Sequence, residues 1–222
     1  MLIYVYWIIL FCMAYPVPAK KVRSEVVIGG SRFIVTLAPA FSVDMARDFI
    51  GRVRKEFGDA THNVPAFLIG SGNSITAHAS DDGEPSGTAG RPALSVLRGS
   101  GLGDVVVVVT RYFGGPKLGT GGLVKAYTQA VNAVVSIVPR AQKVMAHSVR
   151  IAVPYPLFER VQLLVKSLDG EVLDEDFAAE VTMTLRLQVE KFERLENRLQ
   201  ELSAGKIAVQ IIETSEILLK LR

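Results

Sequence analysis

The sequence contains little of what metal centres and disulfide-stabilised folds are built from. It has one cysteine, Cys12, and three histidines, at positions 62, 78 and 147. A single thiol forms no internal disulfide and supplies no zinc site made of cysteines. So few histidines also argue against a histidine-rich metal site, and the sequence predicts neither a metal nor another cofactor. Low cysteine content is typical of a reducing compartment, so we expect a cytoplasmic protein.

Neither sign of charge is in large excess. The 25 lysines and arginines outnumber the 22 acidic residues by three, and the pI is near 9.0. This weak positive balance permits contact with RNA or with an acidic protein surface, and requires neither. Hydrophobic residues make up 49% of the 222 positions, an ordinary globular proportion. The length suits one large domain or two small ones, either with a sizeable core.

Charged side chains are missing altogether from the start of the chain, where the first is Lys20. Residues 1–15 are almost wholly apolar, but a membrane-spanning helix needs about 20 such residues, and prolines follow at positions 16 and 18. No basic stretch precedes the apolar one, as it would in a secretory signal, although Pro18-Ala19 resembles a small-residue cleavage site. We therefore expect no association with a membrane.

The start of the chain has three interpretations. The leading one is that translation begins at Met13, and the alternatives are a signal or anchor and a packed or partner-binding segment. Residues 1–12 are accordingly left out of the fold prediction, and residues 1–19 are assigned to an apolar leader. The oligomeric state and any relative motion of the domains leave no mark on the sequence.

Residues 20–144 show the pattern of an α+β domain. Two β-branched runs, 21–28 and 31–37, flank the turn signal Gly29-Gly30 and predict a hairpin. Ser42 is a good N-cap for an amphipathic helix over residues 43–57. Later segments of this region predict two strands, two helices and a loop of about 20 residues between them, a length that is often functional. The strands are 63–70 and 104–110, the helices 91–98 and 123–138, and the loop 71–90.

The strand at 104–110 is expected to be buried, because its apolar run is continuous rather than alternating.

Residues 145–222 follow a different rhythm, in which strands and helices alternate as βαββαβ. This order is the signature of a ferredoxin-like sandwich. The predicted strands are 148–153, 170–174, 178–189 and 206–212, and the predicted helices are 157–167 and 192–202. The tail after residue 212 has no assignment. The whole chain is therefore predicted to be α+β with two domains.

One glycine-rich stretch, residues 111–127, has the composition of an anion site. It leads from the buried strand into a helix N-terminus, where free N–H groups and the helix dipole attract anions. Basic side chains add charge, and Tyr112, Phe113 and Tyr127 add aromatic faces for bases. Thr120 stands where a Walker A loop needs lysine, and Val124 where a dinucleotide fingerprint needs glycine. The predicted binding residues are Arg111, Tyr112, Gly114, Gly115, Lys117, Gly119, Thr120, Gly121, Gly122 and Lys125.

The competing interpretation of these glycines is structural, since glycine permits tight turns and close packing of a helix on a sheet.

A second stretch, residues 81–90, holds three carboxylates within four positions: Asp81, Asp82 and Glu84. It lacks the spacing of a calcium loop. We expect these residues to make turns and a carboxylate–guanidinium pair with Arg111, and Thr88 to cap the next helix. A catalytic role would make one of these carboxylates, or His62, a general base. His62 alone is better explained as a hydrogen-bonded residue at the start of a strand.

Three segments in order, residues 60–63, 81–90 and 111–127, closely resemble the YigZ/IMPACT family. The resemblance implies a first domain like domain IV of elongation factor G, a ribosomal-protein-like α/β sandwich, and a ferredoxin-like second domain like its domain V. It also implies a role in translation, since eukaryotic relatives restrain a starvation-sensing kinase of translation initiation. The apolar leader departs from the family pattern.

Three functions remain open at this point. The first is a binding and regulatory protein that contacts RNA, the ribosome or a translation factor. The second is a hydrolase-type enzyme acting on a phosphorylated or peptide substrate, although no metal-ligand set supports a peptidase. The third is a regulator that binds another protein through the open sheet of the second domain.

Overall fold

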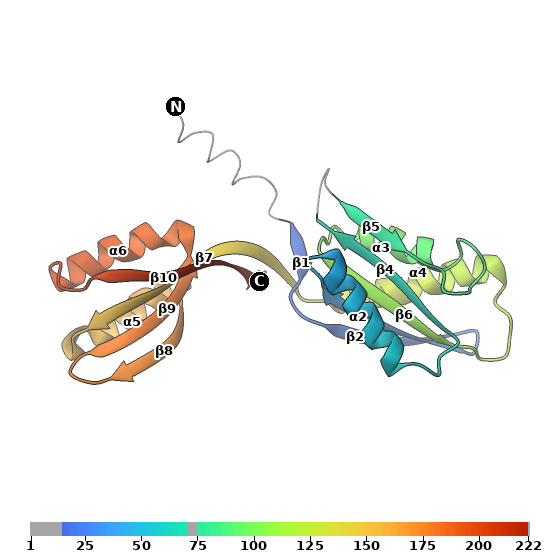
Figure 1. Cartoon of the computed structure of the whole chain (residues 1–222), viewed down its shortest axis with the longest axis horizontal. Helices are drawn as coiled ribbons and strands as arrows, with labels where there is room; N and C mark the ends of the chain where they lie inside the picture. Colours follow the sequence, from blue (N-terminus) through green and yellow to red (C-terminus); the bar gives the residue numbers. More distant parts are fainter. Residues whose placement is uncertain (1–14, 71–74, 222) are drawn as a thin grey trace, which may run out of the picture. The chain divides into compact units, whose positions relative to one another are not determined.

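The computed structural model describes residues 15–70 and 75–221 and divides the chain into two compact units. Unit 1 extends to Lys143 and includes the end of the chain from Leu219, and unit 2 is Val144–Leu218. Both units combine helices with sheets (Figure 1), which confirms the prediction of a two-domain α+β protein. No helix of the described residues is long and apolar enough to cross a membrane.

Unit 1 is built on a five-stranded sheet with the order β2-β3-β6-β4-β5, and each neighbouring pair is antiparallel. The predicted hairpin is present, with the turn formed by Gly29 and Gly30 at φ of 54° and 78°. Two successive positive φ angles are the geometry of a tight hairpin turn that suits glycine. The strands are β2 (Val22–Ile28), β3 (Ser31–Pro39), β4 (His62–Ile69), β5 (Thr76–Ala79) and β6 (Val105–Tyr112).

Helices cover both faces of this sheet (Figure 1). On one face pack α3 (Gly90–Gly99) and α4 (Gly119–Ile137), and on the other packs α2 (Val43–Glu56). The five valines of β6 are divided between two cores, since alternate side chains of a strand point to opposite faces. The prediction of a buried strand is therefore confirmed, although the sheet is antiparallel.

Helix α2 begins as its sequence predicts. The Ser42 hydroxyl accepts a hydrogen bond from the Met45 backbone N–H at 3.1 Å. This bond satisfies one of the N–H groups that lack a partner inside the helix. Four apolar side chains of α2 are buried against the sheet: Ala46, Phe49, Ile50 and Val53.

Three predicted segments, the last of them in the second predicted domain, have different bounds in the structure. The loop expected over residues 71–90 contains β5, which pairs with β4; its residues 71–74 lie outside the described part. Helix α4 begins at Gly119, four residues before the predicted start. The prediction placed the start too late because the first turn is rich in glycine and shows no apolar periodicity. Strand β7 (Arg140–Val153) begins eight residues early.

The last residues of the predicted leader belong to unit 1. Strand β1 (Pro16–Pro18) pairs with β7, with Val17 opposite Ala141, and Val17 is fully buried. The Tyr15 hydroxyl donates a hydrogen bond to the Asp104 carboxylate at 2.6 Å. A domain start at residue 20 is therefore too late.

Unit 2 has the predicted βαββαβ order. The strands lie side by side as β10-β7-β9-β8, with the first and third strands in the centre, as in a ferredoxin-like sandwich. The tail left unassigned belongs to β10, whose exposed residues hide its periodicity. After β7 the elements are the short helix η1 (Tyr155–Leu157), α5 (Phe158–Ser167), β8 (Glu171–Phe177), β9 (Val181–Gln188), α6 (Val189–Ser203) and β10 (Val209–Lys220).

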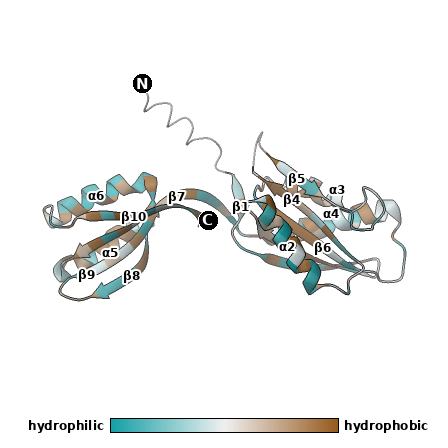
Figure 2. Cartoon of the chain, in the orientation of Figure 1, coloured by the Kyte–Doolittle hydropathy of each residue, from teal (hydrophilic) through white to brown (hydrophobic). Residues whose placement is uncertain are grey.

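The core of unit 2 lies between its sheet and its two helices. Along β9, buried residues alternate with partly exposed ones, so one face of the sheet is covered by helices. Helix α6 likewise shows both hydrophobic and hydrophilic residues (Figure 2). Its Leu195 and Leu199 lie in the core, and its other side presents charged residues.

Candidate functional site

The two motif segments of unit 1 meet in a buried ion pair. Arg111, near the end of β6, donates a hydrogen bond from Nη1 to Glu84 Oε1 at 2.6 Å. The two side chains are only 6% and 3% exposed. Glu84 Oε1 also accepts a bond from the Tyr127 hydroxyl at 2.8 Å, and Arg111 Nη2 donates to Ser31 Oγ at 3.1 Å. The predicted carboxylate–guanidinium pair is present, and we call Ser31, Glu84, Arg111 and Tyr127 the Glu84 cluster.

Aromatic rings enclose the guanidinium of Arg111. Its Cζ lies 5.5 Å from the centroid of Phe33 and 5.7 Å from that of Phe113. Rings at such distances attract a cation through their π faces. The predicted role of Arg111 as a cation presented to phosphates does not fit this burial, because Glu84 already balances its charge. Arg111 Nε is buried without a hydrogen-bond partner among the described residues.

Tyr127 is a structural member of the Glu84 cluster. It is fully buried in α4 and packs edge-on against Phe33, with ring centroids 5.3 Å apart. Burial, and then the negative charge of Glu84 and the hydrogen bond to it, raise the pKa of Tyr127 far above its ordinary value. The hydroxyl therefore stays protonated and donates to Glu84. The suggestion that Tyr127 offers a face to bases is wrong, since the ring is enclosed.

His62 lies beside the Glu84 cluster at the start of β4. Its Nδ1 is 2.7 Å from the backbone carbonyl oxygen of Asp82, which only accepts, so Nδ1 donates. Its Nε2 lies 3.9 Å from Glu84 Oε2, and the side chain is 19% exposed. Among the described residues, no serine, threonine or cysteine is hydrogen-bonded to His62. The arrangement is that of an oriented strand histidine without a paired nucleophile.

The Asp82 carboxylate fastens the acidic loop to β4 and α2. One oxygen accepts a bond from the Asn63 backbone N–H at 2.6 Å, and the other from Arg54 Nη2 at 2.5 Å. Asn63 continues the network, because its Oδ1 accepts from the Thr110 hydroxyl at 2.7 Å. Each carboxylate oxygen of Asp82 thus accepts one hydrogen bond that holds the loop in place.

Asp81 caps α3 from nine residues away. One carboxylate oxygen accepts from the backbone N–H groups of Ala89 and Gly90, at 3.1 and 2.8 Å, and the other from Gly87 at 2.8 Å. Burial alone would raise the pKa of Asp81, but these three donors outweigh it and lower the pKa. Thr88 is not the cap that the sequence suggested, since its hydroxyl donates to the Pro85 carbonyl at 2.6 Å.

The glycines of the predicted binding loop have two different roles. At Gly114 a Cβ atom would lie 1.9 Å from the Gly30 carbonyl oxygen, so two backbones cross where no side chain fits. At Gly115, Gly119 and Gly121 a Cβ atom would meet nothing within 4 Å, although Gly115 and Gly119 have positive φ. Gly114 fits the structural interpretation, whereas the other three form an open surface.

The exposed part of the predicted site lies around the start of α4. Lys117 and Lys125 are exposed and form no ion pair with any described residue, and Thr120 is exposed between them in sequence. Helix α4 has no side-chain cap and no acidic residue in its first turn. Tyr112, by contrast, donates its hydroxyl to Asp59 at 2.8 Å. Two lysines and the open glycine backbone of this surface, which we call the α4 entry surface, remain available.

The described residues contain no cluster of three or more acidic, histidine or cysteine side chains able to hold a metal ion. Sequence reasoning missed Ser31 and Asn63 and misjudged Tyr127. The helical spacing of Tyr127 with the apolar residues of the predicted helix does indicate its burial, and it conflicts with a role in stacking on bases. Ser31 and Asn63 carry no such signal, because their partners are 80 and 47 residues away in the chain.

Comparison with known proteins covers both units. The Impact N-terminal domain matches residues 29–135, and a domain of unknown function, DUF1949, matches residues 151–206. An IMPACT family member of Haemophilus influenzae is 36% identical over 203 residues, which cover 91% of this chain and 98% of that protein. The IMPACT family member YigZ of Escherichia coli is 36% identical over 198 residues, or 89% and 97% of the two chains.

A solved structure described only as a hypothetical protein is as similar in sequence to this chain as these two relatives are. It is 36% identical, covers 90% of this chain and 98% of its own, and has a TM-score of 0.59. The translational regulator Yih1 matches 55% of this chain and 48% of its own, at 22% identity and a TM-score of 0.33. Identity above one third over nearly the full length of two curated relatives places this chain in the YigZ/IMPACT family.

Proposed function

We propose that this protein is a translation-associated binding and regulatory protein, and that the α4 entry surface of unit 1 contacts an anionic partner. The partner is RNA, the ribosome or a translation factor. Translation as the setting comes from the family resemblance. The observation that carries the binding site is local: Lys117, just before the uncapped start of α4, and Lys125, in its second turn, are exposed and unpaired among the described residues.

The charge balance around this surface supports binding by the lysines rather than by Arg111. The Glu84–Arg111 pair is buried and internally neutral, so it adds no net field for a phosphate. Exposed lysines, in contrast, retain their full charge and release counterions when they meet phosphates. The uncapped N–H groups at the start of α4 add donors directed toward the same ligand.

The same geometry weighs against the hydrolase alternative. A general base needs a nucleophile or a water in reach and a free lone pair. Of the candidate bases, Asp81 and Asp82 use both carboxylate oxygens in hydrogen bonds within the protein, and Glu84 uses Oε1 to accept from Arg111 and Tyr127. His62 is held by the Asp82 carbonyl and faces Glu84. These side chains support the loop that precedes α3.

Binding of the purified chain to ribosomes and to total RNA, measured between about 50 and 200 mM salt, tests the proposal. The variants are Lys117→Ala and Lys125→Ala, singly and together. Each phosphate contact that is lost should reduce the slope of log affinity against log salt by about one. Lys55→Ala is the matched control, because Lys55 is exposed on α2, which covers the opposite face of the sheet.

Binding that weakens with salt and with both site variants, but not with the control, supports the proposal. Equal losses of affinity in the three single variants, Lys117→Ala, Lys125→Ala and Lys55→Ala, would mean that binding depends only on net charge. Binding that is insensitive to both lysines would move the contact away from α4. Absence of binding to either partner at low salt would remove RNA and the ribosome from the proposal.

A further inference from the structure

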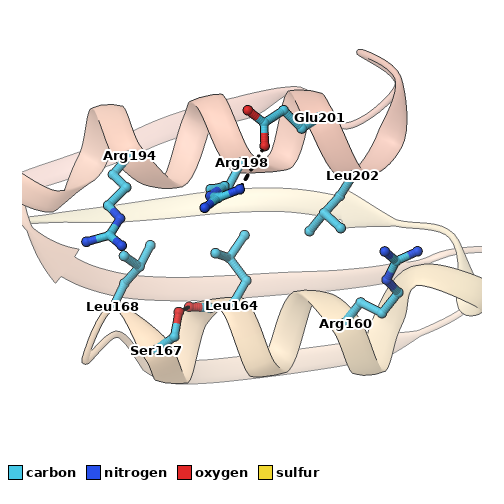
Figure 3. A pocket seen from close by; sticks show the side chains of 8 residues that line it. All are labelled: Arg160, Leu164, Ser167, Leu168, Arg194, Arg198, Glu201 and Leu202. Atoms are coloured by element: carbon cyan, nitrogen blue, oxygen red, sulfur yellow. Dashed lines mark hydrogen bonds and ion pairs between the residues drawn. The ribbon is translucent and has the colours of Figure 1, made fainter.

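A groove of about 570 Å³ opens between α5 and α6 of unit 2, and it has no counterpart in the sequence predictions. Figure 3 shows the side chains that line it. They are chiefly of two kinds: three leucines, Leu164, Leu168 and Leu202, and three arginines, Arg160, Arg194 and Arg198. A surface that combines aliphatic and cationic side chains in a hollow is suited to a ligand with both characters.

The leucines form the apolar part of the groove. Leu164 lies on α5, and Leu168, four residues later, is the residue that caps its C-terminus, so the two side chains lie on one side of the helix. Leu202 comes from α6, and all three point into the space between the helices (Figure 3). Leu168 is buried, whereas Leu164 and Leu202 keep part of their surface exposed to water. An apolar partner that covered this surface would gain free energy in proportion to the area removed from water.

The arginines leave the groove with an excess of positive charge. Arg198 pairs with Glu201 at 3.0 Å, whereas Arg160 and Arg194 form no ion pair with any described residue. Three arginines and one glutamate give the lining a formal charge of +2. In Figure 3 the two unpaired arginines lie at opposite ends of the groove, with leucines between them. A partner therefore needs negative charge at two places separated by an apolar stretch.

We propose that this groove binds an acidic amphipathic segment of another protein, with leucine-like side chains in the centre and carboxylates at both ends. Arginine forms two parallel hydrogen bonds with a carboxylate, and an amphipathic helix in an apolar groove is a recurring recognition mode. RNA fits less well, because no aromatic side chain lines the groove for stacking on a base. Residues 1–14 of this chain contain no acidic side chain and do not meet the requirement.

This site is in unit 2 and is independent of the α4 entry surface proposed in unit 1. The probe is a fluorescein-labelled 16-residue peptide with leucines at helical spacing between glutamates at both ends. The control peptide has lysine at every glutamate position, and a labelled 12-residue oligouridine tests the nucleic-acid alternative. Binding to the full chain is followed by fluorescence anisotropy, and the backbone amides that shift are mapped by NMR.

The variants are Arg160→Glu and Arg194→Glu, with Arg150→Glu as the matched control. Arg150 is an exposed arginine of β7 in the same unit that forms no ion pair with described residues. Each groove variant should weaken the acidic peptide by about tenfold, since like charges at an interface repel. The double variant should abolish measurable binding, and the control should change it by less than twofold.

Amide shifts confined to α5 and α6, with these losses, would support the proposal. It would be overturned if the lysine peptide bound as well as the acidic one, or if Arg150→Glu reduced binding as much as the groove variants. Oligouridine binding lost in Arg160→Glu and Arg194→Glu, without binding of the acidic peptide, would replace it with a nucleic-acid site. Absence of binding of either probe at about 1 mM would also contradict it, because the dissociation constant would then be weaker than millimolar.

Discussion

The two units differ in the burial and pairing of their arginine side chains. In unit 1, Arg111 is buried against a carboxylate, a hydroxyl and two aromatic rings, and its charge is balanced within the fold. In unit 2, Arg160 and Arg194 stand in an open groove and no described carboxylate pairs with them. A charge removed from water needs a partner at once, whereas an exposed charge is hydrated until a ligand replaces the water. The buried charges therefore belong to the supporting structure, and the unpaired, exposed charges mark the candidate surfaces, including Lys117 and Lys125 within the glycine-rich motif.

Among the substitutions that test this contrast between buried and exposed arginines, Glu84→Ala should have the largest effect on the free energy of unfolding. The change leaves the guanidinium of Arg111 and the hydroxyl of Tyr127 buried without their acceptor, and the free energy of unfolding should fall by about 3–5 kcal/mol. Urea denaturation followed by circular dichroism measures the loss, and hydrogen exchange in α4 assigns it to unit 1. The control is Glu25→Ala, since the exposed Glu25–Arg32 pair should contribute about 0–1 kcal/mol. Equal losses in the two variants would contradict the structural role of Glu84.

The next effect separates the two kinds of glycine in the loop before α4. Gly114→Ala would place a methyl group against the Gly30 carbonyl, and the resulting strain should cost about 1–3 kcal/mol or more. Gly121→Ala meets open space within the first turn of α4 and should stabilise that helix by up to about 1 kcal/mol. Melting temperatures of the two variants, compared with the unchanged chain, should therefore move in opposite directions. A similar decrease in both would mean that the open glycines also serve packing.

A third, smaller effect depends on pH and concerns Asp81. Because its folded-state pKa lies below the unfolded value of about 3.9, the stability it contributes is fully present above that value and is lost as the pH falls through the folded-state pKa. Asp81→Asn should lower the free energy of unfolding at pH 7 by about 1–3 kcal/mol, through weaker bonds to three N–H groups. The difference between the variant and the unchanged chain should narrow below about pH 4. Urea denaturation at pH 7 and at pH 3 measures both values, and a gap that stays constant would show that the carboxylate charge is not involved.

The smallest effect on the free energy of unfolding is expected for the exposed arginines of unit 2. Arg160→Ala and Arg194→Ala should each change the free energy of unfolding by less than about 0.5 kcal/mol, because neither arginine has a partner to lose. Leu199→Ala, in the core of the same unit, should cost about 2–5 kcal/mol and shows that the measurement is sensitive. A loss of more than 1 kcal/mol in either arginine variant would mean that the groove arginines stabilise the fold.

Local patterns in the sequence determined most of the secondary structure. The valines of β6, the Gly29-Gly30 turn and the Ser42 cap each act through neighbouring residues, so their outcome could be predicted. The ferredoxin-like order of unit 2 followed in the same way from its apolar periodicity. Boundaries were missed where local signals were weak, as in the glycine-rich first turn of α4 and the exposed outer part of β10.

Long-range partners were decided by the tertiary structure alone. The sequence allowed a pair between the acidic loop and Arg111, but only the crossing of β6, α4 and the loop makes Glu84 its acceptor and encloses both. The groove between α5 and α6 exists only because the two helices pack side by side on one sheet. Hydrogen bonding and helical periodicity act over a few residues, and the sequence records them directly. Burial and charge balance depend on residues brought together from distant positions, so only the folded chain fixes which cations are enclosed and which are open to a ligand.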